Sequence, residues 1–348
     1  MQAMKFNILI LVMFLLASCQ TRSQKDVDTY KDVKLRIDSV IVNNNFNGVV
    51  LITKDTTKIY AKAKGYSDIE TKKLMRLEDQ FVIGSISKQI TAVLILRQYE
   101  KGIIKLNDAI GQYLTGINQA WAEEVTIHQL LTHTHGIVTL NKPLEFKPGS
   151  NFHYSQLGYE LLANILEKLS SKTFNELSTE LFNKYGLINT FHPDNNGYGN
   201  LVKGYVEGEN GKLKYCSNSL SNYVPAGSFI SNVQDLSKWN QLLYSGQLVK
   251  KETLELMQIK YATRIHPIFD KVDYGYGLLF KDGEQHMQIG ALGYSPGFVS
   301  ACYFYPQLNM NVVVLENTAN HLYKFRKTFK VHTEIMGLIK NECLILTP

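Results

Sequence analysis

Apolar positions along the chain form two kinds of run, short ones typical of β-strands and longer ones typical of helices. The short runs lie near both ends of the chain, and most of the long runs lie between them. The pattern predicts strands at about 46–53, 57–64, 274–280, 284–289, 298–305 and 311–316. It predicts helices at about 85–101, 158–169, 174–185, 233–244 and 322–339. This order indicates an α/β protein of the α+β type: an antiparallel sheet built from both ends of the chain and covered by terminal helices, with a mostly helical part inserted.

Ser85 and Lys88 stand at the start of the predicted helix 85–101, which is apolar on nearly every face. Side chains three residues apart on a helix share one face and lie about one turn apart. A serine hydroxyl becomes a nucleophile when a neighbouring base takes its proton, and a partly desolvated lysine can be that base. The alternative is structural: Ser85 caps the helix and Lys88 is a solvated first-turn residue.

Tyr154 and Gln156 follow a Pro-Gly turn at 148–149 and share one side of a short extended piece. A tyrosine beside a lysine ammonium has a lowered pKa and can carry a proton between nucleophile and leaving group. The amide of Gln156 could bind a substrate carbonyl. The alternative for Tyr154 is an ordinary half-buried aromatic residue, because the chain holds 20 tyrosines.

Eight segments, in a fixed order, resemble the motifs of one protein family; they are 46–52, 84–89, 130–136, 146–159, 225–228 followed by Asp235, 274–277, 296–298 and 312–317. The family is the serine beta-lactamase and penicillin-binding-protein superfamily, and the likeness is greatest to its class C, D-alanyl-D-alanine carboxypeptidase and esterase branch. The resemblance implies a beta-lactamase/transpeptidase-like fold. It also implies that Ser85 is acylated while Lys88 and Tyr154 manage the protons. Gln156 stands where the family commonly has asparagine.

The third motif of that family, His-x-Gly or Lys-Thr-Gly, is altered. Counting back from Gly297 places Ala291–Gly293 there, so the glycine is kept and the cation or imidazole is lost. The rival register, Gln288–Gly290, leaves a three-residue excess before Gly297, and we therefore expect the alanine register. By resemblance, Gly293 lets substrate lie against the strand, and the backbone N–H groups of Ser85 and Tyr294 form the oxyanion hole.

The loss at Ala291 predicts weaker binding of a substrate carboxylate, and hence better turnover of neutral esters than of beta-lactams or D-alanyl peptides. His135 and His286 are candidates to supply the missing imidazole. The alternative is that both are polar surface residues.

The N-terminus predicts export. Lys5 precedes an apolar run at 8–17 that is too short to span a bilayer, and residues 16–19 (Leu-Ala-Ser-Cys) resemble the lipobox of a bacterial lipoprotein. We expect a signal peptide at 1–18, lipid on Cys19, a polar tether at 19–31 and one serine hydrolase domain at 32–348. Its α/β part is expected at about 32–84 and 265–348, and its helical part at about 85–264. Because Gln20 is not aspartate, the expected location is the cell envelope, with an outer-membrane lipid anchor. An ordinary secretory peptide is the alternative.

Composition agrees with an exported enzyme. The 348 residues are 45% hydrophobic, and a net charge of +6 is scattered without a basic block, which argues against nucleic acid as a partner. Cys216, Cys302 and Cys343 have no metal-type spacing, and no metal or other cofactor is expected.

Two functions remain open. One is a serine acyl-enzyme hydrolase or acyltransferase acting on an ester or amide, of the esterase, D-alanyl peptidase or beta-lactamase type, with a small-molecule or peptidoglycan-derived acyl substrate. The alternative is a catalytically impaired penicillin-binding or sensory relative that binds cell-wall fragments without turnover.

Overall fold

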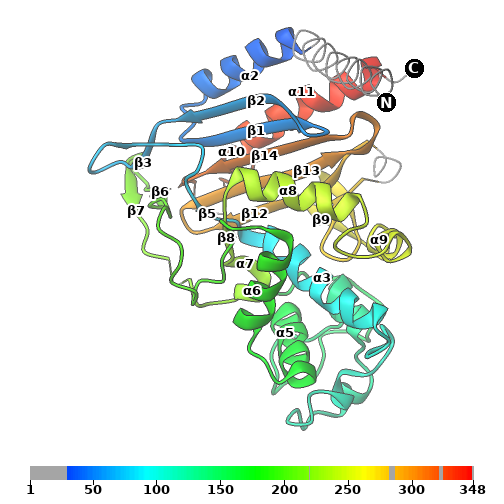
Figure 1. Cartoon of the computed structure of the whole chain (residues 1–348). Coiled ribbons are helices and arrows are strands. Elements are labelled where there is room, and N and C mark those ends of the chain that lie inside the picture. Colours follow the sequence, from blue (N-terminus) through cyan, green and yellow to red (C-terminus); the bar gives the residue numbers. More distant parts are fainter. Residues whose placement is uncertain (1–29, 219, 282–286, 321–323, 347–348) are drawn as a thin grey trace, which may run out of the picture.

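A computed structural model describes residues 30–218, 220–281, 287–320 and 324–346 (Figure 1). The predicted signal peptide, Cys19, most of the tether and His286 lie outside these residues. Tyr30 is buried, and the first helix among the described residues begins at Lys31, which is where the predicted tether ends.

The central element is an eight-stranded sheet in the order β2-β1-β14-β13-β12-β11-β10-β9, antiparallel throughout. Its strands are β1 (Gly48–Lys54), β2 (Thr57–Lys64), β9 (Ala262–His266), β10 (Asp270–Tyr274), β11 (Leu279–Phe280), β12 (Ile289–Ser295), β13 (Phe298–Tyr305) and β14 (Met310–Glu316). Strands from the two ends of the chain are neighbours, because β1 pairs with β14. This arrangement confirms the predicted fold class.

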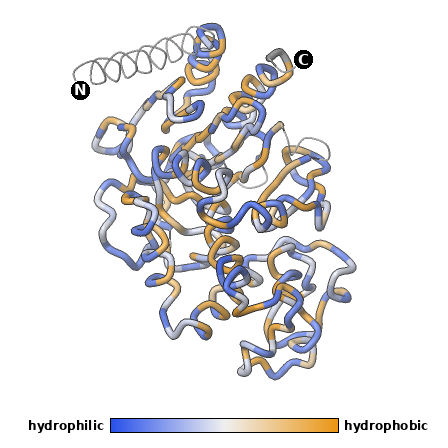
Figure 2. The backbone as a smooth tube through the Cα atoms, turned by 45° about the vertical axis from the view of Figure 1, so that its right-hand side comes forward, coloured by the Kyte–Doolittle hydropathy of each residue, from blue (hydrophilic) through white to orange (hydrophobic). Residues whose placement is uncertain are grey.

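Helices cover both faces of the sheet. On one face lie α2 (Lys31–Asn43) and α11 (Lys330–Leu346), and on the other lies α8 (Val233–Tyr244) (Figure 1). Residues of β1 alternate between the two cores: Val50 and Ile52 pack with α2, while Val49 and Leu51 belong to the core that includes α8. Hydrophilic and hydrophobic residues alternate along α2 (Figure 2), as expected for a helix with one buried stripe.

The helical part lies beside the sheet in Figure 1 and surrounds α3 (Ser87–Glu100), whose first ten residues are all buried. Its other helices are α4 (Ile127–Thr132), α5 (Leu157–Ser170), α6 (Phe174–Tyr185), α7 (Val224–Gly227) and α9 (Lys251–Met257), with 3-10 turns at η1 (Gly84–Ile86), η2 (Ile110–Gln112) and η3 (Ala120–Glu123). A central helix that is buried all round must be enclosed by other elements, and α5, α6 and α7 enclose it.

Shorter elements complete the described chain. They are β3 (Tyr66–Asp68) with β4 (Lys73–Leu74), β5 (Phe81–Val82) with β8 (Ile230–Ser231), β6 (Tyr205–Glu207) with β7 (Leu213–Tyr215) and β15 (Thr318–Ala319), the turn η4 (Pro306–Leu308) and α10 (Phe325–Thr328).

Several elements differ from the sequence expectations. The single strand expected at 274–280 is two strands, β10, which ends at Tyr274, and β11 (Leu279–Phe280). The strand expected at 284–289 is instead β12, which begins at Ile289, and the closing helix expected at 322–339 is α11, which begins at Lys330. The edge strand β9 and helix α2 were not predicted. Helix α2 had a readable signal, because its buried residues Val33, Ile37 and Ile41 are spaced by four.

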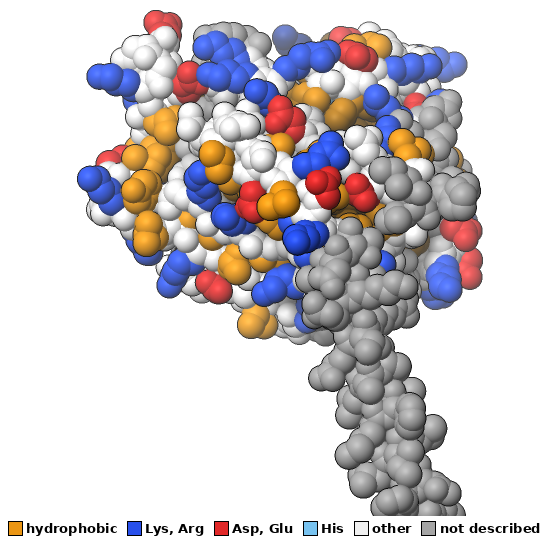
Figure 3. All heavy atoms as spheres, turned by 90° about the horizontal axis from the view of Figure 1, so that it is seen from above, with side chains coloured by type: hydrophobic (Ala, Val, Ile, Leu, Met, Phe, Trp, Pro, Cys, Tyr) orange, Lys and Arg blue, Asp and Glu red, His pale blue; other side chains and the backbone are white. Residues whose placement is uncertain are grey.

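Basic and acidic side chains are interspersed on the face seen in Figure 3, without a block of one sign. Among the described residues, no helix has the length and apolar character needed to cross a membrane. Cys216, Cys302 and Cys343 are free thiols.

Candidate active site

Ser85 lies on the 3-10 turn that leads into α3, and this turn is pressed against β12. Gly84 has a left-handed φ of 54°, and a Cβ placed on it would lie 2.4 Å from the backbone nitrogen of Tyr294. The preceding carbonyl, that of Ile83, accepts a hydrogen bond of 2.7 Å from the Ser300 hydroxyl. The sheet therefore fixes the position of a serine that is itself partly exposed.

Lys88 is 1% exposed and makes three kinds of contact beside Ser85. Its ammonium donates to Ser85 Oγ at 3.3 Å and to the carbonyl of Ala226, on α7, at 2.7 Å. It also lies 4.7 Å from the centre of the Tyr154 ring. The purely structural alternative is wrong on both counts, because Lys88 is not solvated and Ser85 caps neither η1 nor α3.

Tyr154 completes this group, and its pKa is lowered. Burial alone would raise the pKa, but the charge of Lys88, contacts with the Ser85 hydroxyl and the Lys88 ammonium, and the charge of Arg264 outweigh it. A phenol with a lowered pKa gives up and takes back a proton more readily at neutral pH. Ser85, Lys88 and Tyr154 are thus one contact group.

The ring of His133 packs against the ring of Tyr154. Its ring centre lies 4.4 Å from that of Tyr154, its Nδ1 accepts from the Ser155 backbone N–H at 3.2 Å, and its Nε2 lies 3.1 Å from the Tyr274 hydroxyl. Because Nδ1 accepts, the ring proton is on Nε2 and is donated to Tyr274. Burial and the charge of Lys88 hold the pKa of His133 well below its usual range, so the ring is neutral.

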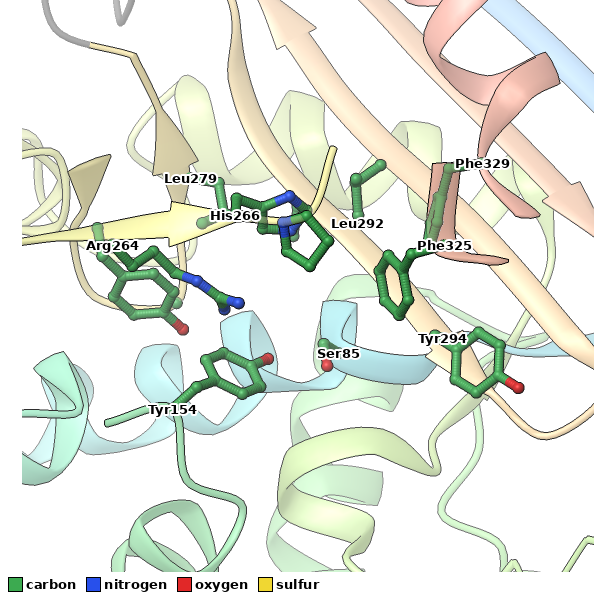
Figure 4. Close-up of a pocket in the computed structure, with 13 residues that line it drawn as sticks. Ser85, Tyr154, Arg264, His266, Leu279, Leu292, Tyr294, Phe325 and Phe329 are labelled. Atoms are coloured by element: carbon green, nitrogen blue, oxygen red, sulfur yellow. The ribbon is translucent and has the colours of Figure 1, made fainter. Parts of the chain in front are cut away.

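A cavity of about 220 Å³ opens in front of Ser85 (Figure 4). Its walls are mostly apolar or aromatic, and Arg264 is the charged residue among those that line it. The lining residues are Ser85, Tyr154, Arg264, His266, Pro267, Tyr274, Gly277, Leu279, Ala291, Leu292, Tyr294, Phe325 and Phe329.

The altered third motif is only partly at this cavity. Ala291 and Tyr294 line it, whereas Gln288 lies elsewhere, at the hydroxyl of Tyr305. Gly293 does not line it. A Cβ on Gly293 would lie 2.1 Å from the carbonyl oxygen of Ile83, so this glycine allows the Ser85 segment, rather than substrate, to pack against β12.

The side chain of Gln156 approaches the Ser85 turn, because a Cβ on Gly227 would lie 3.9 Å from Gln156 Oε1 and 4.0 Å from the carbonyl carbon of Gly84. Gln156 is exposed, absent from the cavity lining and already helical (φ −79°, ψ −36°) as the N-cap of α5. Because the extended conformation ends before Gln156, the two-residue alternation that was expected to align it with Tyr154 does not apply.

Of the two histidines proposed for the missing imidazole, His286 lies outside the described residues and His135 does not line the cavity. His135 is fully buried, so the surface alternative is also wrong for it; its Nδ1 accepts from the backbone of Ile137, and burial lowers its pKa to about 4. Arg264 and His266 of β9 line the cavity instead. Their spacing of two on a strand was the signal that could have placed them on one face.

The antiparallel sheet, the helical part and the serine–lysine pair at their junction define the class: the fold of the beta-lactamases and penicillin-binding proteins. The family model described as Beta-lactamase matches residues 37–332, so the chain belongs to this family, whose members are serine hydrolases. The resemblance drawn from the sequence motifs is thereby confirmed.

Proteins that are similar to this chain support the family assignment. The chain is 25% identical over 321 residues to penicillin-binding protein 4* of Bacillus subtilis, covering 79% of this chain and 68% of the relative. The structure is similar to that of the octameric penicillin-binding protein homologue from Pyrococcus abyssi, with a TM-score of 0.73, 24% identity and coverage of 88% and 77% of the two chains. It is also similar to D-amino acid amidase from Ochrobactrum anthropi, with a TM-score of 0.78, 18% identity and coverage of 90% and 99%.

Proposed function

We propose that the protein is a serine hydrolase or acyltransferase that forms an acyl-enzyme on Ser85 with an ester or amide substrate. The observation that carries this proposal is the contact of 3.3 Å between the buried Lys88 ammonium nitrogen and Ser85 Oγ, beside the Tyr154 ring. A buried lysine held at a partly exposed serine is the arrangement that nucleophilic catalysis requires.

In the first half-reaction the Ser85 hydroxyl attacks the substrate carbonyl. Its proton passes to the Lys88–Tyr154 pair as the new C–O bond forms, and the pair returns that proton to the leaving group as the old bond breaks. In the second half-reaction water, or another nucleophile, attacks the acyl-enzyme and gives a proton to the pair, which returns it to Ser85 Oγ. No proton is gained or lost by the enzyme over the cycle.

The oxyanion that forms in each half-reaction needs hydrogen-bond donors. We assign this role to the backbone N–H groups of Ser85 and Tyr294. The packing at Gly84, the residue directly before Ser85, supports this assignment, because a Cβ on Gly84 would lie 2.4 Å from the Tyr294 nitrogen. Both donors would be fixed before substrate arrives, since each belongs to an element held by the sheet.

One observation favours a second candidate, a penicillin-binding or sensory relative that is acylated without turnover. Ala291 lines the cavity at the third motif and offers no group to assist deacylation. Such a protein would bind cell-wall fragments or beta-lactams and keep the acyl group on Ser85.

Labelling and turnover separate the two functions. The full chain should be labelled by a fluorophosphonate and should hydrolyse an activated aryl ester with many turnovers. Ser85→Ala should abolish both, while Ser39→Ala, which removes an exposed hydroxyl on α2, should change neither. Labelling with a single turnover supports the sensory relative, and turnover that survives Ser85→Ala excludes both candidates.

We further propose that the protein is held in the cell envelope by lipid on Cys19, on the outer membrane. The proposal is supported by the sequence at 16–19 and by Gln20.

A further inference from the structure

A second cavity, of about 580 Å³, lies where β3, β6, β7 and β15 meet the start of α11 (Figure 1). It is larger than the cavity at Ser85, and its volume falls within the range of small-molecule sites, about 300–1,000 Å³. Among the described residues, the two cavities share none of their lining. We infer that this second cavity binds a neutral saccharide, a function that does not depend on Ser85.

Amide side chains supply hydrogen-bonding groups at this cavity. Asn44, Asn45 and Asn320 line it, and an amide both donates and accepts hydrogen bonds, as the hydroxyls of a sugar do. Asn44 Nδ2 donates to the carbonyl of Val40 at 2.9 Å and to Glu334 Oε2 at 3.0 Å, which uses both of its hydrogens. Within the described part of the chain, nothing pairs with the Asn44 side-chain oxygen or with the Asn45 amide. These groups are therefore available to a ligand.

Two buried atoms at the same cavity also lack a partner among the described residues: Asn320 Oδ1 and Thr328 Oγ1. A polar atom that is buried without a hydrogen bond is costly, so each would be stabilised by a new partner. Rotation about a side-chain bond turns such an atom toward the cavity, where a ligand hydroxyl can pair with it. The free protein thus holds hydrogen-bonding capacity that its own groups do not use.

The charges around the cavity cancel, which selects a neutral ligand. The Lys327 ammonium donates to both carboxylate oxygens of Glu207, at 2.9 and 2.6 Å, and Lys330 Nζ lies 3.8 Å from a carboxylate oxygen of Glu334. Glu316 is buried, and burial raises its pKa to about 8, so its carboxyl is neutral at pH 7. A charged ligand meets no unpaired opposite charge among the described lining residues, and it would lose hydration without compensation.

An exposed aromatic and apolar surface borders the polar groups. Tyr66 and Leu213 are both exposed and line the cavity. Tyr215, also exposed, follows Leu213 by two residues on β7, so the two side chains share a face of that strand. The backbone N–H and carbonyl of Tyr66 are held by the side chain of Asn47, at 2.6 and 2.9 Å. Aromatic rings pack against the C–H face of a sugar, while amides bind its hydroxyls.

Calorimetric titration of the full chain with three neutral disaccharides tests the inference: cellobiose, maltose and N,N′-diacetylchitobiose. At least one should bind at a single site. Binding should persist in Ser85→Ala and in Arg264→Gln, because both residues line the other cavity. Chitobiose, a cationic analogue of two of these sugars, should bind at least roughly tenfold more weakly, since it meets no free carboxylate. N-acetyl-trialanine amide, a neutral peptide, should not bind.

Two glycine variants locate the ligand. Asn45 has a left-handed φ of 51°, so Asn45→Gly removes the amide without straining the backbone. Loss of a neutral hydrogen bond should weaken binding by roughly two- to tenfold. Asn309→Gly is the matched control, because Asn309 also has a left-handed φ, 46°, and does not line the cavity. It should leave the affinity unchanged.

Two variants of Tyr66 test the aromatic contact. Tyr66→Ser should weaken binding by roughly two- to tenfold, because the ring is lost while the backbone contacts with Asn47 remain possible. Tyr66→Phe keeps the ring and should retain most of the affinity. A polar role of the hydroxyl alone would instead make the two variants equal.

Four results would each overturn the inference: no binding of any of the three disaccharides, equal or tighter binding of chitobiose or of the peptide, loss of binding in Arg264→Gln, or full affinity in both Asn45→Gly and Tyr66→Ser. The third result would place the sugar in the cavity at Ser85. None of these measurements uses an ester, so turnover that depends on Ser85 remains a separate test of the proposed function.

Discussion

Replacing Gly84 by alanine probes how tightly the nucleophile turn is pressed against the sheet. Gly84 has a φ of 54°, and its added methyl would lie 2.4 Å from Tyr294 N and 2.9 Å from Gly293 Cα. Gly102, after the end of α3, is the matched control. It also has a left-handed φ, 69°, but a Cβ there meets nothing within 4 Å.

The two substitutions share one cost and differ in another. A left-handed backbone costs a non-glycine residue about 1–2 kcal/mol, and both variants should lose that amount. Gly84→Ala adds an overlap with backbone atoms that no side-chain rotation relieves, typically about 1–3 kcal/mol. We therefore expect Gly84→Ala to be destabilised by about 2–5 kcal/mol and Gly102→Ala by about 1–2 kcal/mol.

The overlap should also separate the two backbone N–H groups assigned to the oxyanion hole. Loss of one such donor typically slows acylation by about a hundred- to a thousandfold. Urea unfolding gives the stability difference, and the rate of fluorophosphonate labelling of folded protein gives the acylation difference. If Gly84→Ala matched Gly102→Ala in both measurements, the close packing of the Ser85 turn on β12 would be refuted as the basis of the site.

Three further predictions concern other parts of the chain. Lys88→Ala and Tyr154→Phe should each slow acylation by about a hundredfold or more, and the double variant should be little slower, because the two residues act as one unit; multiplicative losses would exclude a shared proton path. Burial raises the pKa of Glu316 to about 8, so the native state binds an extra proton between pH 4.5 and about 8 and stability falls as pH rises through this window. Glu316→Gln should therefore stabilise the protein by about 3–5 kcal/mol at pH 9 and by much less at pH 5, with unchanged ester turnover; an equal effect at both pH values in urea unfolding contradicts this. The mature protein from its native host should begin at a lipid-bearing Cys19, and mass spectrometry showing an unmodified chain that starts later would exclude the anchor.

The parts of the site that the sequence predicted depend on local spacing. Ser85 and Lys88 are three residues apart, so helical geometry alone brings them together, and the count back from Gly297 placed Ala291 at the cavity. The alternation used to align Gln156 with Tyr154 does not apply, because the backbone of Gln156 is already helical. Arg264 could not be predicted, because its contact with Tyr154 joins two segments more than a hundred residues apart that share no motif.

The fold was predicted best where strands are rich in β-branched or aromatic residues, as in β1, β13 and β14. The strand β12 was placed too early because Gly290 and Gly293 weaken its strand pattern. Both glycines are needed there, since a Cβ on Gly290 would lie 2.2 Å from the carbonyl oxygen of Cys302 and one on Gly293 would meet Ile83. Close packing thus removed the sequence signal for the strand that supports the site.

The pairing of β1 with β14 bears on when the protein becomes reactive. Gly48 lies opposite Glu316, so the sheet joins residues from opposite ends of the chain. The turn that carries Ser85 is held by β12, and β12 is held by β13 and β14. A nascent chain has synthesised Ser85, Lys88 and Tyr154 long before these strands exist. We therefore expect the proposed nucleophile to stay inactive during synthesis and to gain its reactivity only after β12, β13 and β14 have been made and have folded.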